Sequence, residues 1–169
     1  MQKSESQPQE HPVDHESRIA PGDHVALKLW LRLLTCTNLI EKRIRRELRH
    51  EFGSTLPRFD LLAQLQRQPE GLKMRELSRR LMVTSGNITA LADQLETEGM
   101  IERLSHSGDK RATLLRLTLL GTQRFAQMAR THEDWVVELC AGLNRNEQQV
   151  LHGLLGKLKN GMLASSPAS

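Results

Sequence analysis

The stretch from Leu81 to Thr118 constrains the fold more than any other part of the chain. It begins with a helical pattern that ends at Gly99, and two short segments of alternating apolar and polar residues follow, Met100–Leu104 and Ala112–Leu117. The residues between these segments are typical of a turn. A helix followed directly by a hairpin of two strands is the arrangement of a winged helix, and we predict that fold for this stretch.

The helix of this stretch has an exposed face of an uncommon kind. Helical spacing puts Thr84, Ile88, Leu91 and Leu95 on one stripe. Small and amide side chains remain outside that stripe, namely Gly86, Asn87, Ala90, Asp93 and Thr97. Solvent-facing positions usually carry Glu, Lys and Arg, whereas a face that enters the major groove of DNA needs short side chains, an amide for adenine and methyl groups for thymine. We therefore predict a DNA-reading helix, with Thr84 or Ser85 as its N-cap.

The remainder of the chain predicts further helices. Residues 23–52 repeat apolar side chains at steps of three and four, namely Leu33, Thr37, Ile40, Ile44, Leu48 and Phe52, with Trp30 and Leu34 beside them. Two short helices follow, one starting at Pro57 and one covering 73–81, and Thr118 is placed to cap a long helix. Asn144 and Glu147 have the spacing of a capping box before a last helix. The predicted fold is mainly α, with a two-stranded wing.

Composition restricts the classes of partner. Lys and Arg outnumber Asp and Glu by 24 to 20 and the pI is about 9.4, which favours a polyanionic partner. Aromatic residues make up 3% of the chain and Tyr is absent, which argues against the stacking surfaces of RNA or single-strand binders. No apolar run approaches the roughly 20 residues that span a bilayer, and the N-terminus lacks the apolar core of a signal peptide. We expect a cytoplasmic protein without a membrane partner.

No catalytic site, metal site or cofactor is predicted. Histidines occur without zinc-ligand spacing, and the chain has neither a Gly-rich phosphate loop nor a Gly-x-Ser-x-Gly elbow. Cys36 and Cys140 are too few and too far apart for a disulfide framework or a Cys-x-x-Cys zinc site. Cys36 also falls on the apolar stripe of residues 23–52. We therefore expect both thiols to be free and buried.

A second signature follows the turn of the hairpin. Asp109 and Arg111 form an Asp-x-Arg pair, five residues separate Arg111 from Leu117 and Thr118, and Gly121 comes shortly afterwards. With this signature and the helical segment that precedes it, the chain resembles the MarR family of bacterial transcriptional regulators from about Val25 to Met162.

The resemblance implies a homodimer bound to double-stranded DNA. The expected organisation is a disordered arm (1–22), a dimerisation helix (23–56), a winged helix-turn-helix lobe (57–118), C-terminal dimerisation helices (119–163) and a tail (164–169). Each lobe would read one half of a pseudo-palindromic site, with the halves about 34 Å apart. Asp109 would brace the wing by ion pairing. The expected DNA contacts are Lys73, Thr84, Ser85, Asn87, Thr89, Ser107, Lys110 and Arg111.

The resemblance also implies an effector in a crevice between the dimerisation and DNA-binding halves. Segments 33–43 and 56–61 are similar to members that control the catabolism of aromatic acids or their CoA thioesters. The basic residues between Lys42 and Arg49 would suit the phosphates of CoA. The candidate effector contacts are Trp30, Thr37, Arg43, Arg46 and Arg58. We expect a repressor that such a ligand releases from DNA, and the alternative is a redox sensor that acts through Cys36.

Overall fold

The chain divides into two units. The structure, a computed structural model, describes residues 14–106 and 109–165, without the side chains of 105, 106, 109–112 and 165. The first unit ends at Arg46 and the second begins at Glu47, within the long helix α1 (Val25–Phe52). The DNA-reading stretch predicted from the sequence lies wholly in the second unit.

The first unit contains a short 3-10 helix, η1 (His15–Arg18), that the sequence does not predict. The helix forms because the carboxylate of Asp14 accepts a hydrogen bond from the backbone N–H of Glu16 at 2.9 Å. The carboxylate of Glu16 in turn pairs with Arg32 on α1. Within the predicted arm, the described residues 14–22 thus contain a short helix that contacts α1, whereas residues 1–13 lie outside the described part of the chain.

Helix α1 buries a different set of side chains from the predicted one. The buried residues are Leu31, Thr35, Ile44 and Leu48, of which only the last two belong to the predicted stripe. Trp30 is 57% exposed and Thr37 is also exposed. The N-terminal half of α1 carries apolar side chains at most positions, so its sequence is compatible with more than one stripe. The periodicity alone could not select the buried one.

Three short helices form the core of the second unit. They are α2 (Leu56–Gln66), α3 (Met74–Leu81) and α4 (Ser85–Thr97). The side chain of Thr84 caps α4 by accepting a hydrogen bond from the N–H of Asn87 at 3.3 Å. The buried side chains of these helices are Phe59, Leu61, Leu62, Leu65, Leu77, Ile88, Ala92 and Leu95. The three helices and the Thr84 cap agree with the sequence prediction.

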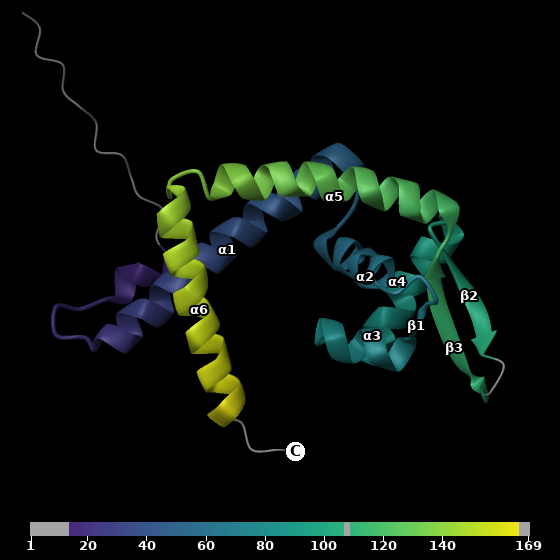
Figure 1. The fold of residues 1–169 in the computed structure, drawn as a ribbon, viewed down its shortest axis with the longest axis horizontal. Coiled ribbons are helices and arrows are strands. Elements are labelled where there is room, and N and C mark those ends of the chain that lie inside the picture. The colour runs from purple at the N-terminus through teal and green to yellow at the C-terminus, as the bar shows by residue number, and fades with distance from the viewer. Residues whose placement is uncertain (1–13, 107–108, 166–169) are drawn as a thin grey trace, which may run out of the picture. The chain divides into compact units, whose positions relative to one another are not determined.

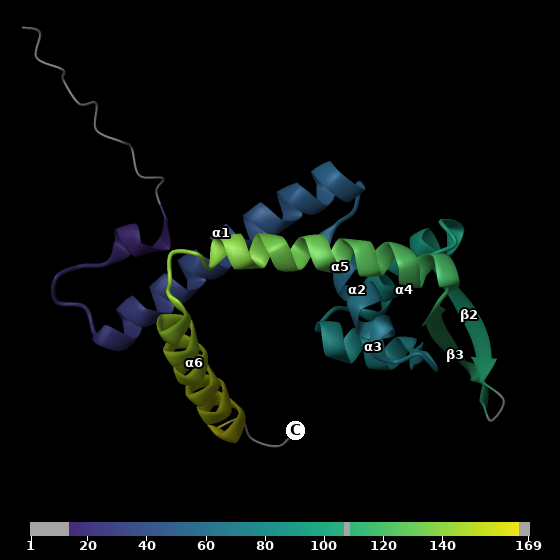
Figure 2. The same ribbon diagram turned by 45° about the horizontal axis from the view of Figure 1, so that its top comes forward.

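A three-stranded antiparallel sheet completes this lobe, in the strand order β1–β3–β2. Strands β2 (Ile101–His106) and β3 (Asp109–Leu117) form the predicted hairpin and lie side by side in Figure 1 and in Figure 2. Strand β1 (Leu72–Lys73) pairs with the other side of β3, with Leu72 opposite Leu115. The sequence does not predict β1, because two residues cannot show an alternating pattern.

Aromatic rings join α2 to the next helix, α5 (Leu119–Leu139). The ring of Phe59 lies 5.4 Å from that of Phe125 and 4.7 Å from that of His132, measured between centroids. Trp135 is buried, with its ring 6.4 Å from that of His132. Burial lowers the pKa of His132, while the carboxylate of Asp60 opposes that shift. This contact between helices therefore favours a neutral imidazole.

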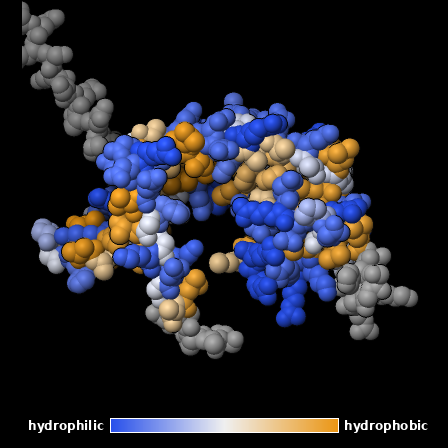
Figure 3. All heavy atoms as spheres, in the orientation of Figure 1, coloured by the Kyte–Doolittle hydropathy of each residue, from blue (hydrophilic) through white to orange (hydrophobic). Residues whose placement is uncertain are grey.

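The last helix, α6 (Arg145–Ser165), begins with the predicted capping box. The backbone N–H of Asn144 donates to the Glu147 carboxylate at 2.8 Å, and the N–H of Glu147 donates to the Asn144 side chain at 3.1 Å. The apolar side chains of α6 stay exposed by 39% to 58% in this single chain, namely Val150, Leu151, Leu154, Leu155, Leu158 and Met162. Figure 3 shows apolar surface along this helix. Among the described helices, none is long and apolar enough to cross a membrane.

Candidate nucleic-acid interface

Helix α4 presents the exposed face that the sequence predicts. Ile88, Ala92 and Leu95 are fully buried beneath it. The opposite side exposes Ser85, Gly86, Asn87, Thr89, Ala90, Asp93 and Thr97. Apart from Gln94, which is also exposed, the side chains of this face are short, so the N-terminal part of α4 can bring its backbone close to the base edges of a major groove.

The N-terminal turn of α4 carries polar groups and no carboxylate. The Thr84 cap occupies one of its backbone N–H groups, and the hydroxyl of Thr89 donates to the carbonyl of Ser85 at 3.0 Å. The aligned peptide dipoles add partial positive charge at this end of the helix. The N-terminal end of α4 can therefore contact base edges and phosphates without electrostatic repulsion.

Ion pairs hold the wing to α4 and hold its strands together. Arg103 on β2 pairs with Asp93 at 2.5 Å and with Glu96 at 2.9 Å, both on α4. The hydrogen bond to Asp93 raises the pKa of Arg103. Across the hairpin, Arg116 on β3 pairs with Glu102 on β2 at 2.6 Å. Sequence reasoning missed Arg103, because its partners belong to another element and no local spacing connects them.

The wing tip lies at the limit of the described residues. Ser107 falls outside them, and so do the side chains of Asp109, Lys110 and Arg111, whose backbone forms the start of β3. The brace predicted for Asp109 and the DNA contacts predicted for the other three residues therefore stay predictions.

Cationic side chains occur on the segment before α4. Lys73, a predicted DNA contact, is exposed on β1 opposite Leu114 of β3. On α3, the carboxylate of Glu76 accepts from Arg79 at 2.6 Å and from Arg80 at 2.8 Å. The hydrogen bond from Arg80 lowers the pKa of Glu76. Because two arginines share one carboxylate, this part of α3 keeps a positive surplus.

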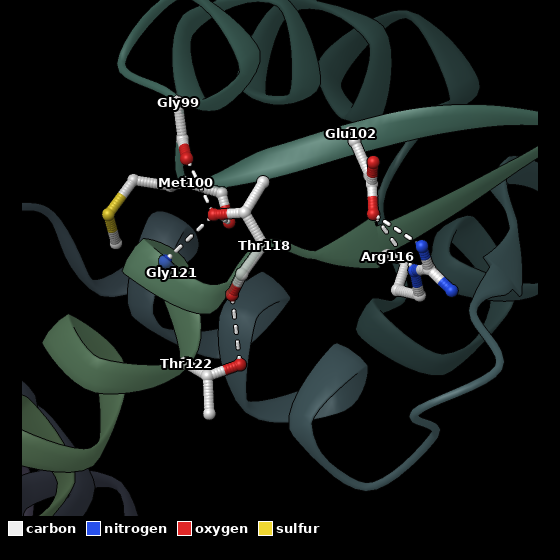
Figure 4. A network of polar contacts seen from close by, with 7 residues as sticks. All are labelled: Gly99, Met100, Glu102, Arg116, Thr118, Gly121 and Thr122. Carbon is white, nitrogen blue, oxygen red and sulfur yellow. Dashed lines mark hydrogen bonds and ion pairs between the residues drawn. The ribbon is translucent and has the colours of Figure 1, made fainter.

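One hydroxyl group joins the end of α4 to the start of α5. Figure 4 shows the hydroxyl of Thr118 donating to the carbonyl of Gly99 at 2.6 Å and accepting from the N–H of Gly121 at 2.9 Å. The N–H of Thr118 donates to the carbonyl of Met100 at 3.1 Å. The hydroxyl of Thr122 donates to the carbonyl of Thr118 at 3.0 Å. The end of α4, the base of the wing and the first turn of α5 are thus fixed together at Thr118.

The predicted effector contacts fall in two separate parts of the chain. Trp30, Thr37, Arg43 and Arg46 lie on the part of α1 that belongs to the first unit. Arg58 lies on α2 in the second unit, where it lines a cavity of about 320 Å³. Only Arg58 among the predicted contacts therefore borders this cavity.

The cavity beside Arg58 has a mixed lining. Its residues come from the end of α1, from α2, from the α4–β2 junction and from α5: Glu51, Phe52, Ser54, Arg58, Leu62, Glu98, Met100, Arg124, Gln127 and Met128. Arg58 forms an ion pair with Glu98, which is the C-cap residue of α4. The volume is at the lower end of the range for small-molecule sites. Sequence reasoning missed Arg124, because an arginine on the polar face of a long helix gives no distinct signal.

The structure corrects the prediction for Cys36. Its side chain is exposed on α1, and that of Cys140 is partly buried next to the end of α5. The predicted stripe turned Cys36 inward with Leu33, whereas α1 buries Leu31 and Thr35. The thiol of Cys36 is therefore accessible in the single chain.

The segment from α2 to the wing matches a known protein family, because the model of the MarR family covers residues 54–113. The chain is 28% identical to the transcriptional repressor YetL of Bacillus subtilis, over 88% of this chain and 89% of YetL. A MarR family transcriptional regulator from Silicibacter pomeroyi has a similar structure, with 31% identity and a TM-score of 0.69 over 81% of this chain and 94% of the other. Sco3205 of Streptomyces coelicolor, a MarR family regulator solved in complex with DNA, has a TM-score of 0.72 at 23% identity, over 84% of this chain and 91% of its own.

Proposed function

Because the chain belongs to the MarR family of transcriptional regulators, we propose that it is a homodimeric, cytoplasmic repressor that a small ligand releases from DNA. Its target is a pseudo-palindromic site in double-stranded DNA, and one copy of α4 reads each half of that site. The ligand is a small aromatic carboxylate or its CoA thioester. The relatives named above are transcriptional regulators, and catalysis has no part in this function.

The exposed face of α4 is the observation that carries the DNA-binding proposal. Asn87 offers an amide that suits an adenine edge, and Ala90 offers a methyl group that suits thymine. The hydroxyls of Thr84, Ser85 and Thr89 add groups that can bond to bases or phosphates. We assign the positive charge that contacts the phosphates to Lys73, Lys110 and Arg111, and Ser107 is a further proposed contact.

The exposed apolar side chains of α6 support a homodimer. Leu154 is 58% exposed and Met162 is equally exposed, and Val137 near the end of α5 is 65% exposed. Removing apolar surface from water contributes about 25 cal/mol per Å². Two-fold symmetry brings an identical apolar face from a second copy of the chain, so a second copy is suited to cover the exposed side chains of α6.

The cavity beside Arg58 supports the ligand-responsive part. It combines apolar side chains such as Phe52 and Leu62 with the cations Arg58 and Arg124, a combination that suits an aromatic carboxylate. Arg58 is already paired with Glu98 at the end of α4. A ligand carboxylate on Arg58 competes with that pair and releases the end of the DNA-reading helix. The ligand must bind the released state more tightly, since equal affinity for both states would leave the equilibrium between them unchanged.

A CoA thioester carries phosphates in addition to its aromatic acyl group. Arg43 and Arg46 on α1 are the proposed phosphate contacts, and Trp30 and Thr37 on the same helix are further proposed contacts of the effector. The two ligand classes predict different effects of substitutions at these arginines. Arg58→Gln removes both the pair with Glu98 and the ligand contact, so it should weaken DNA binding without ligand and make that binding insensitive to either ligand. Arg43→Gln and Arg46→Gln should keep the DNA affinity and raise the concentration needed for release by the thioester alone. Fluorescence anisotropy of labelled DNA, with aromatic acids and their CoA thioesters as competitors, measures both responses. If no compound of either class releases the wild type, the ligand proposal fails.

The DNA-binding proposal is tested on a duplex that the wild type selects from a random-sequence pool. Arg111→Ala should weaken binding to every duplex and reduce the slope of log Kd against log salt concentration by about one. Asn87→Ala should instead relax the preference at one base step, by about 1–3 kcal/mol. If Arg111→Ala binds as tightly as the wild type at every salt concentration, the wing assignment is wrong. A wild type that selects no sequence contradicts the whole proposal.

The dimer is tested by sedimentation. The wild type should sediment as a dimer, while a chain ending at Glu147 and the full-length variant Leu154→Glu should be monomeric. Lys159→Glu introduces the same charge at an exposed polar position of α6 and should remain dimeric. A monomeric wild type would exclude this assembly.

The exposure of Cys36 favours a second candidate, a redox-sensing regulator. An accessible thiol is a requirement for reaction with an oxidant. Peroxide should then abolish DNA binding by the wild type and leave Cys36→Ser unaffected. If the wild type keeps its DNA affinity in peroxide, this candidate is excluded.

A further inference from the structure

Met82 occupies the turn between α3 and α4 in a conformation that L-residues rarely adopt. Its φ is +54° and its ψ is +37°, the left-handed helical region. Among the described residues, Met82 is the one residue other than glycine that has a positive φ. The side chain is 94% exposed. A large apolar group is thus held in solvent two residues before the N-cap of α4.

Hydrogen bonds fix the turn that carries Met82. Its N–H donates to the carbonyl of Arg79 at 3.3 Å, and the N–H of Val83 donates to the carbonyl of Ser78 at 3.1 Å. The hydroxyl of Ser78 donates to the carbonyl of Val83 at 2.5 Å. Thr84 then caps α4. The position of the Met82 backbone relative to the start of α4 is therefore defined by both helices.

Folding does not account for methionine at this position. Left-handed backbone destabilises a residue with a Cβ atom, and glycine or asparagine adopts it with less strain. The exposed thioether also contributes no apolar burial within the chain. A rare backbone conformation that the surrounding structure maintains is a reason to look for a function.

We propose that Met82 is a specificity-determining DNA contact, whose side chain packs against an apolar part of the duplex beside the bases that α4 reads. This inference rests on the proposed DNA-binding function. The apolar part is the C5 methyl of a thymine in the major groove or the deoxyribose at the edge of that groove. An unbranched thioether with three rotatable bonds adapts to either surface. The short polar side chains of Ser85 and Asn87 in the first turn of α4 cannot make such a contact.

The test compares Met82→Gly and Met82→Leu on the duplex that the wild type selects from a random-sequence pool. Met82→Gly removes the side chain and the backbone strain together, so its melting temperature should equal or exceed that of the wild type while its affinity for DNA falls roughly 3- to 10-fold. Met82→Leu keeps the apolar group and should retain most of the affinity. The slope of log Kd against log salt concentration should be unchanged in both, because no charge is removed.

A second arm replaces each thymine of the duplex with deoxyuridine. If the difference between wild type and Met82→Gly disappears on this duplex, Met82 contacts a thymine methyl; if the difference remains, it contacts deoxyribose. If Met82→Gly is less stable than the wild type, Met82→Asn, which also tolerates the left-handed region, provides the same comparison. A stable variant without the apolar side chain that binds as tightly as the wild type overturns the inference and leaves the proposed function intact. A wild type that selects no duplex overturns both.

Discussion

A Cβ atom on Gly121 would lie 1.8 Å from the carbonyl oxygen of Met100. The first turn of α5 therefore packs on the backbone at the base of the wing with no room for a side chain. We expect Gly121→Ala to lower the free energy of unfolding by roughly 2–4 kcal/mol, because one of the two backbones must move. Urea denaturation measures this change.

Gly86→Ala is the matched control for Gly121→Ala. Gly86 also lies in the first turn of a helix capped by threonine, but a Cβ there would meet nothing within 4 Å. Alanine should leave stability unchanged or raise it by about 0.5–1 kcal/mol. Equal urea midpoints for the two variants would show that α5 is not packed tightly on Met100.

Thr118→Val should destabilise the lobe by about 1–2 kcal/mol. Valine keeps the shape of the side chain but removes the hydroxyl that bonds to Gly99 and Gly121. Thr122→Val removes a hydroxyl that bonds only to the preceding turn of the same helix, so its effect should stay within about 0.5 kcal/mol. Thermal denaturation of both variants gives the comparison, and an equal loss in the two would contradict the special role of Thr118.

Arg103→Gln should loosen the wing without unfolding the lobe. The ion pairs of Arg103 with Asp93 and Glu96 are partly exposed, and such pairs contribute about 0.2–1 kcal/mol. Amide hydrogen exchange in β2 should nevertheless become faster, since these pairs connect β2 to α4. Arg79→Gln breaks a pair within α3 only and should leave exchange in β2 unchanged. Identical exchange in the wild type and Arg103→Gln would show that the ion pairs of Arg103 do not hold β2 to α4.

The stability of the chain should depend on the protonation of His132. Burial holds its pKa below the value in the unfolded chain, so between these two pKa values the unfolded chain binds more protons. Neutral His132 makes its full contribution to the free energy of unfolding above the pKa of the unfolded chain, about 6.5. This contribution is lost as the pH falls toward the pKa of His132 in the folded chain. The fall in melting temperature from about pH 7.5 to about pH 5.5 should be smaller in His132→Gln. An unchanged fall would assign the pH dependence to other groups.

Helix starts were predictable because their causes are local. The Thr84 and Thr118 caps and the capping box of Asn144 with Glu147 each depend on residues within one turn of the chain. The exposed face of α4 was predictable for the same reason, since helical spacing alone separates it from Ile88 and Leu95.

The features that the sequence did not predict depend on distant partners. Strand β1 exists because Leu72 pairs with Leu115, and the cavity forms where Arg58 meets Glu98. The buried side of α1 was misassigned because apolar residues occur around its N-terminal half, so tertiary contacts decide which of them are covered. Local spacing contains no information on these contacts.

Because Thr118 bonds to residues on both sides of the wing, residues 99–122 form a block that recombination between relatives cannot divide safely. A chimaera that joined α4 of one protein to α5 of another within this block would combine the hydroxyl of one protein with backbone groups positioned by the other. A junction between α2 and β1 leaves the block whole. An engineer who wishes to transfer DNA specificity should therefore move α3, α4, the wing and the start of α5 together, rather than replace the DNA-reading helix alone.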